Sequence, residues 1–180
     1  VLFLNAKNEL FLVWIAVLGN SWEHSILRVK RSLDYQHSGA PNWHWQDNIF
    51  LKPGDEFAEE VKAKFKELPD ADLAWAEYAP SYERMIQEAS ADSKKRSIGW
   101  MTRIKPLISG GKIVLPLYSD GFNFSIMAIS EDHGNTWKPS KPLVGKGPIQ
   151  PALAQRKNGE IVAMLRDSGD GPTMIQQSSS

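Results

Sequence analysis

Two predicted apolar strands in this sequence end in polar side chains that could take part in chemistry. The first ends in Tyr118, Ser119 and Asp120, and the second ends in Arg166 and Asp167. A carboxyl group whose surroundings raise its pKa can act as a general acid or base. An arginine presents a planar, permanently charged group that suits carboxylate binding. Asp120 and Asp167 are therefore candidate catalytic groups, and Tyr118 and Arg166 are candidate ligand-binding groups.

These candidates also have structural interpretations. Asp120 precedes Gly121, and Asp-Gly is an ordinary turn pair. Arg166 could lie at the surface or pair with the adjacent Asp167. Gln150, at the start of another predicted inner strand, could present its amide to a ligand.

An internal repeat relates the two strand ends. Residues 111–114 (GKIV) and residues 159–162 (GEIV) are 48 positions apart, counted from 111 to 159, which is a typical length for a repeated β-sheet unit. At the same offset Tyr118 corresponds to Arg166. Equivalent positions of successive units are therefore the places to look for a site.

The stretch SEDHGNTW, from Ser130 to Trp137, has the chemistry of a tight turn between two strands. Asp132 can accept hydrogen bonds from backbone N–H groups of its own turn, and Gly134 can adopt the positive φ that such a turn requires. The hydroxyls of Ser130 and Thr136 can close the loop. Trp137 can then serve as an apolar anchor.

This spacing, S-x-D-x-G-x-T-W, resembles the Asp-box of the sialidase (neuraminidase) superfamily, also called the BNR repeat. In that family the Asp-box is a structural turn on the outside of a blade and takes no part in catalysis. The resemblance implies an all-β fold, a β-propeller of the six-bladed sialidase type, with about half of it present here. Ser32-Leu33-Asp34, Gly39 and Trp43 keep the elements of a second, degenerate Asp-box with extra residues between them.

The predicted strands group into blades. The first blade, residues 1–52, would contain Val1 to Leu4, Glu9 to Leu18, Ser25 to Arg31 and Trp43 to Leu51. The second, residues 99–147, would contain Arg103 to Ile108, Lys112 to Tyr118, Ser125 to Ser130 and Lys141 to Val144. An incomplete third, residues 148–180, would contain Gln150 to Leu153, Glu160 to Arg166 and Thr173 to Gln177. Because a closed propeller needs at least four blades, we expect a fragment of a longer polypeptide, or pairing with the missing half of the propeller or with another chain.

Residues 53–98 differ from the strands on either side and predict a helical insertion, roughly over 54–98. A first helix is expected after Asp55 as N-cap, with four apolar residues on one face: Phe57, Val61, Phe65 and Leu68. A second helix is expected to begin near Pro80, with one face made of Tyr82, Met85, Ile86 and Ala89. An insertion of this size is more often a lid, a rim of a binding site or an interface than a second domain.

A second resemblance concerns Arg103-Ile104-Lys105-Pro106, which is similar to the Arg-Ile-Pro motif that opens a sialidase catalytic domain. The segment lies 27 residues before Ser130, about where that family places it, and it departs from the motif by the inserted Lys105. The resemblance implies that Arg103 belongs to a group of arginines that binds the carboxylate of the substrate, with Arg166 as a second member. Either arginine could instead have a structural role.

The function implied by the resemblance is that of an exo-acting glycoside hydrolase that releases a terminal acidic sugar, sialic acid. Asp120 would protonate the leaving oxygen, with Asp167 as the other candidate acid. The glycosyl-enzyme would form on a Tyr outside this chain. Tyr118 is not assigned as that nucleophile on residue type alone.

Two other functions stay open at this point. A propeller polysaccharide lyase, or another glycosidase acting on uronic acids, would also use arginines to bind a carboxylate. A non-catalytic propeller would bind carbohydrate or protein. A lyase would be recognised by its unsaturated product.

The composition limits the classes of partner. The 180 residues include 21 Lys and Arg and 21 Asp and Glu, so the net charge of zero argues against nucleic acid, and the cluster Lys94-Lys95-Arg96 is expected to be a solvated helix end. There is no Cys, and the four His show no metal-ligand spacing, so no metal site or cofactor is expected. The longest apolar run, Leu10 to Leu18, is too short for a membrane span. A carbohydrate substrate is the expected partner and favours an extracytoplasmic location, although no signal peptide is visible.

Overall fold

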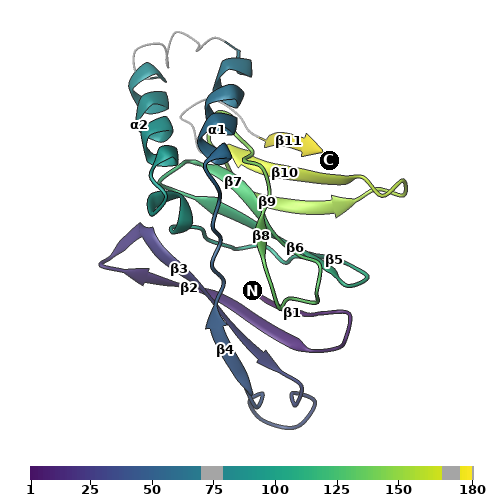
Figure 1. Ribbon diagram of the computed structural model, residues 1–180. Coiled ribbons are helices and arrows are strands. Elements are labelled where there is room, and N and C mark those ends of the chain that lie inside the picture. Colours follow the sequence, from purple (N-terminus) through teal and green to yellow (C-terminus); the bar gives the residue numbers. More distant parts are fainter. Residues whose placement is uncertain (70–78, 168–174, 180) are drawn as a thin grey trace.

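The computed structural model describes residues 1–69, 79–167 and 175–179 and is built mainly of antiparallel sheets (Figure 1). The first sheet has the order β1 (Leu2–Leu4), β2 (Leu10–Leu18), β3 (Ser21–Ser32) and β4 (Trp45–Asn48). The second has the order β5 (Leu107–Ser109), β6 (Lys112–Ser119), β7 (Phe124–Ser130) and β8 (Lys138–Pro139). The third has the order β11 (Ile175–Ser179), β10 (Ile161–Asp167) and β9 (Pro148–Gln155).

The second sheet is covered on both faces. Ile113 on β6 belongs to a core cluster shared with Phe11 of the first sheet, whereas its neighbour Val114 belongs to a cluster shared with Leu165 of the third. This division follows from the alternation of side chains along a strand. The sheets therefore pack in chain order. Three sheets do not show a six-bladed ring, and that arrangement stays a prediction.

Two helices cover one end of the first two sheets, α1 (Glu56–Glu67) and α2 (Ala79–Ala91), followed by the short 3-10 helix η1 (Lys95–Ser97) (Figure 1). The predicted apolar face of α1 is confirmed, since Phe57, Val61 and Phe65 are buried. Phe57 packs edge-on against Trp100, with ring centroids 6.3 Å apart. No helix in the described part of the chain is long and apolar enough to cross a membrane.

Arg96 is buried, so the prediction of a solvated basic cluster is wrong for this residue. The residue is 4% exposed. Nε donates to the carbonyl of Pro53 at 2.9 Å, and Nη1 donates to the carbonyl of Ala91 at 3.0 Å. Nη2 donates to Oδ1 of Asp55 at 2.5 Å. Asp55 occupies the N-cap position of α1 as predicted, but its side chain makes no capping bond, because the carboxylate pairs with Arg96.

Met85 is a second correction in the helical segment. Within the predicted apolar face of α2, Ile86 is 1% exposed, whereas Met85 is 53% exposed. Tyr82 and Ala89 are partly buried against the core. The buried face of α2 is therefore narrower than its sequence suggests.

Two predicted strands differ in their bounds. The predicted strand from Arg103 to Ile108 begins only at Leu107, after Pro106, which has no amide hydrogen to offer a neighbouring strand. The predicted strand from Lys141 to Val144 is replaced by β8, at residues 138–139. Leu143 still makes a single bridge by donating to the carbonyl of Ser125 at 2.8 Å.

Two other strand boundaries also differ from the prediction. The predicted strand Trp43 to Leu51 narrows to β4. The first two residues of the predicted strand Thr173 to Gln177 lie outside the described residues, and β11 begins at Ile175.

The Ser130–Trp137 turn adopts the predicted hydrogen-bonding pattern. Oδ1 of Asp132 accepts from the backbone N–H groups of Asn135 and Thr136 at 3.0 and 2.9 Å, and Oδ2 accepts from Oγ1 of Thr136 at 2.6 Å. Oγ of Ser130 donates to Asp132 at 2.8 Å and accepts from the N–H of Gly134 at 2.8 Å. Gly134 has φ +98°, as the turn requires. A single carboxylate thus organises the turn.

Side chains of the first sheet hold this turn from outside. Nδ2 of Asn5 donates to the carbonyl of His133 at 3.0 Å. Nη1 of Arg31 donates to Oδ1 of Asn135 at 2.8 Å, and Nη2 donates to the carbonyl of Gly134. A Cβ at Gly134 would lie 2.7 Å from Cζ of Phe11, so glycine is also required by the closeness of the two sheets.

A similar turn follows β3 in the first sheet. Oγ of Ser32 accepts from the N–H of Asp34 at 3.1 Å, as Oγ of Ser130 accepts from the N–H of Asp132 at 3.4 Å. Both serines end the third strand of their sheet. The degenerate copy predicted from the sequence therefore shares the serine contact of the intact one.

Replacing Asp132 by Ala should lower the free energy of unfolding by about 1–2 kcal/mol, because several hydrogen bonds to a charged acceptor are lost. Partial burial alone would raise the pKa of Asp132, but hydrogen bonds from Thr136, Ser130 and Asn135 lower it to about 2, from an ordinary value of 3.8. A carboxylate with a lowered pKa stabilises the fold above its unfolded pKa and loses this contribution as the pH falls.

Urea unfolding at several pH values measures this difference. The gap between wild type and D132A should be constant above pH 4 and should shrink between pH 4 and pH 2. E131A, which removes an exposed carboxylate from the same turn, is the matched control and should change little. An equal loss in both variants would contradict the role given to Asp132.

Candidate functional site

Five residues predicted from the sequence come together where β6 ends. The charges of Arg103 and Arg166 act on both Asp120 and Tyr118, and the side chain of Gln150 hydrogen-bonds Tyr118. The five come from different segments: the stretch before β5, the end of β6, and strands β9 and β10. We call them the strand-end cluster.

Backbone pairing brings Arg103 beside the end of β6. Met101 and Tyr118 form an isolated bridge, in which the N–H of each donates to the carbonyl of the other at 2.8 and 2.9 Å. Arg103 follows two residues later, in a segment that is not a strand. Met101, Tyr118 and Ile149 also form a small buried cluster that fixes β9 next to this bridge.

Gln150 hydrogen-bonds Tyr118 from a β-bulge in the third sheet. The register of β9 against β10 shifts between Met164 and Arg166, which is the signature of a β-bulge. Gln150 lies on β9 at this point and has φ +54°. A positive φ is uncommon for a residue with a side chain, and such strain is typically kept at functional sites. The bulge turns the Gln150 amide toward the strand-end cluster.

The pKa of Asp120 is raised above its ordinary value. The residue is exposed at the rim of the cluster, yet its carboxyl group is partly withdrawn from water, and this desolvation raises its pKa. The charge of Arg166 acts in the opposite direction, the charge of Glu23 raises the pKa further, and Arg103 lowers it. The net effect is a raised pKa, which favours the protonated form needed by a general acid.

Tyr118 has the character of a neutral hydrogen-bonding group. It is 6% exposed, and its burial raises the pKa of the phenol, as does the charge of Asp120. Arg103, the hydrogen bond from Gln150 and Arg166 all lower this pKa, but the net direction is upward. Tyr118 therefore stays protonated near neutral pH, which disfavours a role as nucleophile.

Glu23, at the start of β3, is the group that sequence reasoning missed. A Cβ at Gly99 would lie 2.5 Å from the carbonyl oxygen of Glu23, and a Cβ at Gly121 would lie 3.1 Å from its Cγ. The two glycines thus allow the end of the first sheet to approach Asp120. No motif in the sequence links Glu23 to Asp120. The one sequence feature connected with their approach is Gly121, because it leaves room for the Glu23 side chain.

Asp167 follows the cluster residue Arg166 in the sequence, but the two side chains lie on different sides of β10, because side chains alternate along a strand. Within the described residues, its charge is not among the causes that shift the pKa of Asp120 or of Tyr118. Asp120 is therefore the better candidate for the acid.

The Ser130–Trp137 turn lies away from the strand-end cluster. Ser119, at the end of β6, pairs with Phe124 at the start of β7, whereas Ser130 ends β7 and pairs with Ile113. The turn and the cluster thus occupy opposite ends of the second sheet. This placement agrees with a structural role for the turn.

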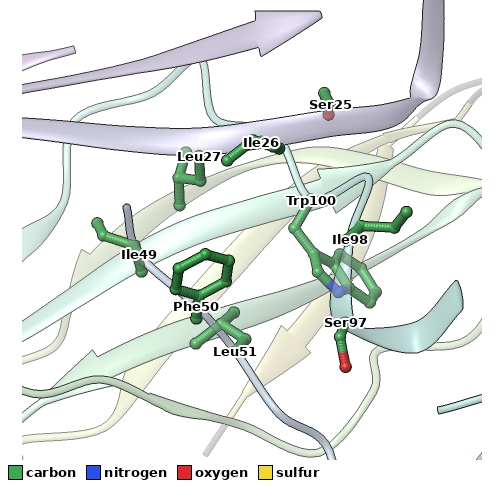
Figure 2. Close-up of a pocket in the computed structure, with 9 residues that line it drawn as sticks. All are labelled: Ser25, Ile26, Leu27, Ile49, Phe50, Leu51, Ser97, Ile98 and Trp100. Atoms are coloured by element: carbon green, nitrogen blue, oxygen red, sulfur yellow. The ribbon is translucent and has the colours of Figure 1, made fainter. Parts of the chain in front are cut away.

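A small cavity between β3 and the segments 49–51 and 97–100 is shown in Figure 2, which labels Phe50, Leu51 and Trp100 among its mostly apolar lining. Its volume is about 50 Å³. Oγ of Ser25, at one edge, is buried without a hydrogen-bond partner among the described residues. A cavity of this size suits water rather than a sugar.

Several solved structures are similar to this chain, and two of them are described here. The chain aligns over 98% of its length with a protein of unknown function from Dyadobacter fermentans, with a TM-score of 0.52 and 15% identity. The match spans 46% of that protein, so the chain covers less than half of its length. This likeness shows a shared fold.

A weaker similarity, with a TM-score of 0.41 and 16% identity, is to a Trypanosoma rangeli sialidase in complex with the inhibitor DANA. It covers 96% of this chain and 25% of the sialidase. No protein-family model matches the chain, and no curated protein matches it significantly.

The charges around Asp120 predict opposite shifts in two variants. In E23Q the pKa of Asp120 should fall, because a neighbouring negative charge is removed, and in R166Q it should rise, because a positive charge is removed. NMR titration of the Asp120 carboxyl carbon measures both. E131Q, far from the cluster, should leave this pKa unchanged. An unchanged Asp120 pKa in E23Q would show that Glu23 does not face it.

Proposed function

We propose that this chain is part of a sialidase-like exo-glycoside hydrolase that releases a terminal acidic sugar, sialic acid, from glycoconjugates. The observation that carries the proposal is the strand-end cluster, in which two arginines flank a carboxyl group with a raised pKa and a neutral, buried tyrosine. Two arginines suit a carboxylate ligand, and a protonated Asp suits the oxygen of a leaving group.

Each residue of the strand-end cluster has a role in this proposal. Arg103 and Arg166 bind the sugar carboxylate through charged hydrogen bonds. Tyr118 and Gln150 bind polar groups of the sugar. Asp120 gives its proton to the glycosidic oxygen as the bond between that oxygen and the anomeric carbon breaks. In the same step a nucleophile outside this chain forms a bond to the anomeric carbon. Water then attacks that carbon, the bond to the nucleophile breaks, and Asp120 takes the proton that the water loses.

The fold and the turn motif support the same proposal. The stacked antiparallel sheets are compatible with blades over residues 1–52, 99–147 and 148–180, and the segment 53–98 then forms a helical insertion. In this interpretation the Ser130–Trp137 turn is an Asp-box and sets the register of the second blade. The rest of a six-bladed propeller would come from further residues of the polypeptide or from another chain.

Replacing Asp120 by Asn should lower kcat for a sialoside by about 10²- to 10⁴-fold, because Asn cannot donate the proton. The full-length protein would be assayed with sialyl-lactose, with release of sialic acid as the measurement. D47N, which changes an exposed Asp on β4, is the control and should keep wild-type activity. Equal activity of D120N and D47N would exclude Asp120 as the acid.

Product analysis in the same assay separates the other functions. An unsaturated product from a uronate-containing polymer would indicate a lyase in place of a hydrolase. Binding of sialic acid without any cleavage by the full-length protein would indicate a carbohydrate-binding module.

Replacing Arg103 by Gln should raise KM for sialyl-lactose by about tenfold or more, since a hydrogen bond to a charged group contributes about 1.5–3 kcal/mol. The same variant should have little effect on the methyl ester of that substrate, which has no carboxylate. R156Q, at the hairpin between β9 and β10 where Arg156 pairs with Glu160 at 2.9 Å, is the control. An equal effect of R103Q on acid and ester would contradict carboxylate binding.

A further inference from the structure

The turn that carries Asp120 is anchored by the helical segment. Residues 120–123 form the turn of the β6–β7 hairpin, and the pair Ser119 and Phe124 closes it. Asp120 is exposed at the start of the turn, whereas Phe122, two residues later, is 3% exposed. Turns between strands usually lie at the surface and are mobile. Here the third residue of the turn belongs to the core, which limits the movement of the whole turn.

The ring of Phe122 is held by residues from both ends of the helical segment. It stacks on the ring of Trp100, with centroids 5.4 Å apart and an angle of 15° between the planes. It meets the ring of Phe57 on α1 edge-on, with centroids 6.2 Å apart. Trp100 is itself fixed, because its Nε1 donates to the carbonyl of Arg96 at 2.9 Å. The start of α1 and the chain after η1 therefore both hold this turn.

A second contact joins the turn to α2. A hydrogen bond links the phenol of Tyr82 to the side chain of Asn123, the last residue of the turn. Asn123 has φ +53°, a left-handed conformation that favours Asn or Gly. Burial raises the pKa of Tyr82 to about 12, although this hydrogen bond acts to lower it. Tyr82 is therefore neutral near neutral pH, so its contact with the turn does not depend on pH in that range.

These contacts connect the helical segment to the proposed acid. We infer that the helical segment holds Asp120 in place for proton transfer, with Tyr82 as the positioning residue on α2, an inference that rests on the proposed function. Position matters because a general acid has to lie within hydrogen-bond reach of the oxygen that it protonates. A small displacement of a reacting group can lower the rate strongly. In this interpretation residues 53–98 act as a support of the site.

The same contacts affect the protonation of Asp120. The largest cause of its raised pKa is partial withdrawal from water, and this depends on where the turn holds the carboxyl group. A turn released from α2 would let water reach that group, so the pKa of Asp120 would fall toward its ordinary value of 3.8. The charges that also act on it, those of Arg166, Glu23 and Arg103, are not altered by a substitution at Tyr82.

Replacing Tyr82 by Phe removes the phenol oxygen and keeps the ring in the core. In the full-length protein Y82F should lower kcat for sialyl-lactose by about tenfold and leave KM within about twofold, because the arginines that bind the carboxylate are unchanged. The basic limb of the pH dependence of kcat should move to lower pH, because Asp120 loses its proton more readily.

Y35F is the matched control. The phenol of Tyr35, in the loop between β3 and β4, donates to the carbonyl of Asn8 at 2.9 Å and makes no printed contact with the turn of residues 120–123. This variant should keep the kcat and the pH dependence of the wild type. Equal losses of kcat in Y82F and Y35F, or a raised KM with unchanged kcat in Y82F, would contradict the inference.

A second variant removes the same hydrogen bond from the other side. N123G loses the amide and keeps a residue that accepts φ +53°. Because both substitutions remove one contact, the double variant Y82F/N123G should lose no more kcat than the weaker of the two single variants. Fully additive losses would show that the two residues act independently, and the positioning role of Tyr82 would then be wrong.

A measurement on Asp120 itself does not depend on catalysis. NMR titration of the Asp120 carboxyl carbon should give a lower pKa in Y82F than in the wild type and an unchanged pKa in Y35F. If this difference is seen while no sialoside is cleaved, the proposed hydrolase function fails and the positioning by the helical segment stands. An equal pKa of Asp120 in Y82F and the wild type would overturn the inference, whatever the activity of the protein.

Discussion

The buried guanidinium of Arg31 is the contact on which the packing of the first two sheets depends. It is 8% exposed and lies 4.9 Å from the ring centre of Phe11 and 4.2 Å from that of Trp45. Burial lowers the pKa of Arg31, while Glu9 and then Asp132 act to raise it. Because an unpaired buried charge is costly, the carbonyl of Gly134 and the amide of Asn135 have to accept its hydrogen bonds. The charge therefore fixes the position of the turn relative to the first sheet.

The strand-end cluster lies at the other end of the second sheet. Its residues are positioned by strand pairing and packing, and among the described residues no buried charge holds them in place as Arg31 holds the turn. Its residues are close because Tyr118 of β6 pairs with Met101, and because both residues pack against Ile149 of the bulged strand β9. Desolvation in this cluster raises the pKa of both Asp120 and Tyr118. In both groups the shift favours the protonated, hydrogen-bond-donating form. The two arginines limit this upward shift in the pKa values, and they add permanent positive charge to the cluster.

The sequence predicted those parts of the fold that depend on local patterns. Runs of apolar residues located β6, β7 and β10, and the 48-residue offset correctly placed Tyr118 and Arg166 at equivalent strand ends. Local patterns could not predict the burial of Arg96, which depends on carbonyl groups of distant segments. They also could not place Glu23, because its approach to Asp120 depends on how two sheets meet. The spacing of apolar residues in α2 predicted a wider buried face than the helix has, because this spacing does not show where the core ends.

Glu23 lines one side of a cleft of about 250 Å³, and its position depends on two glycines, Gly99 and Gly121. Any side chain at Gly99 would collide with the backbone of the first sheet, and one at Gly121 would displace Glu23. The opposite wall, formed by exposed positions on α2, carries no such restriction. Substitutions on α2 can therefore change the surface of this cleft, whereas a side chain at Gly99 or Gly121 would displace Glu23. The helix is thus the place where the cleft can vary at the least cost to the fold.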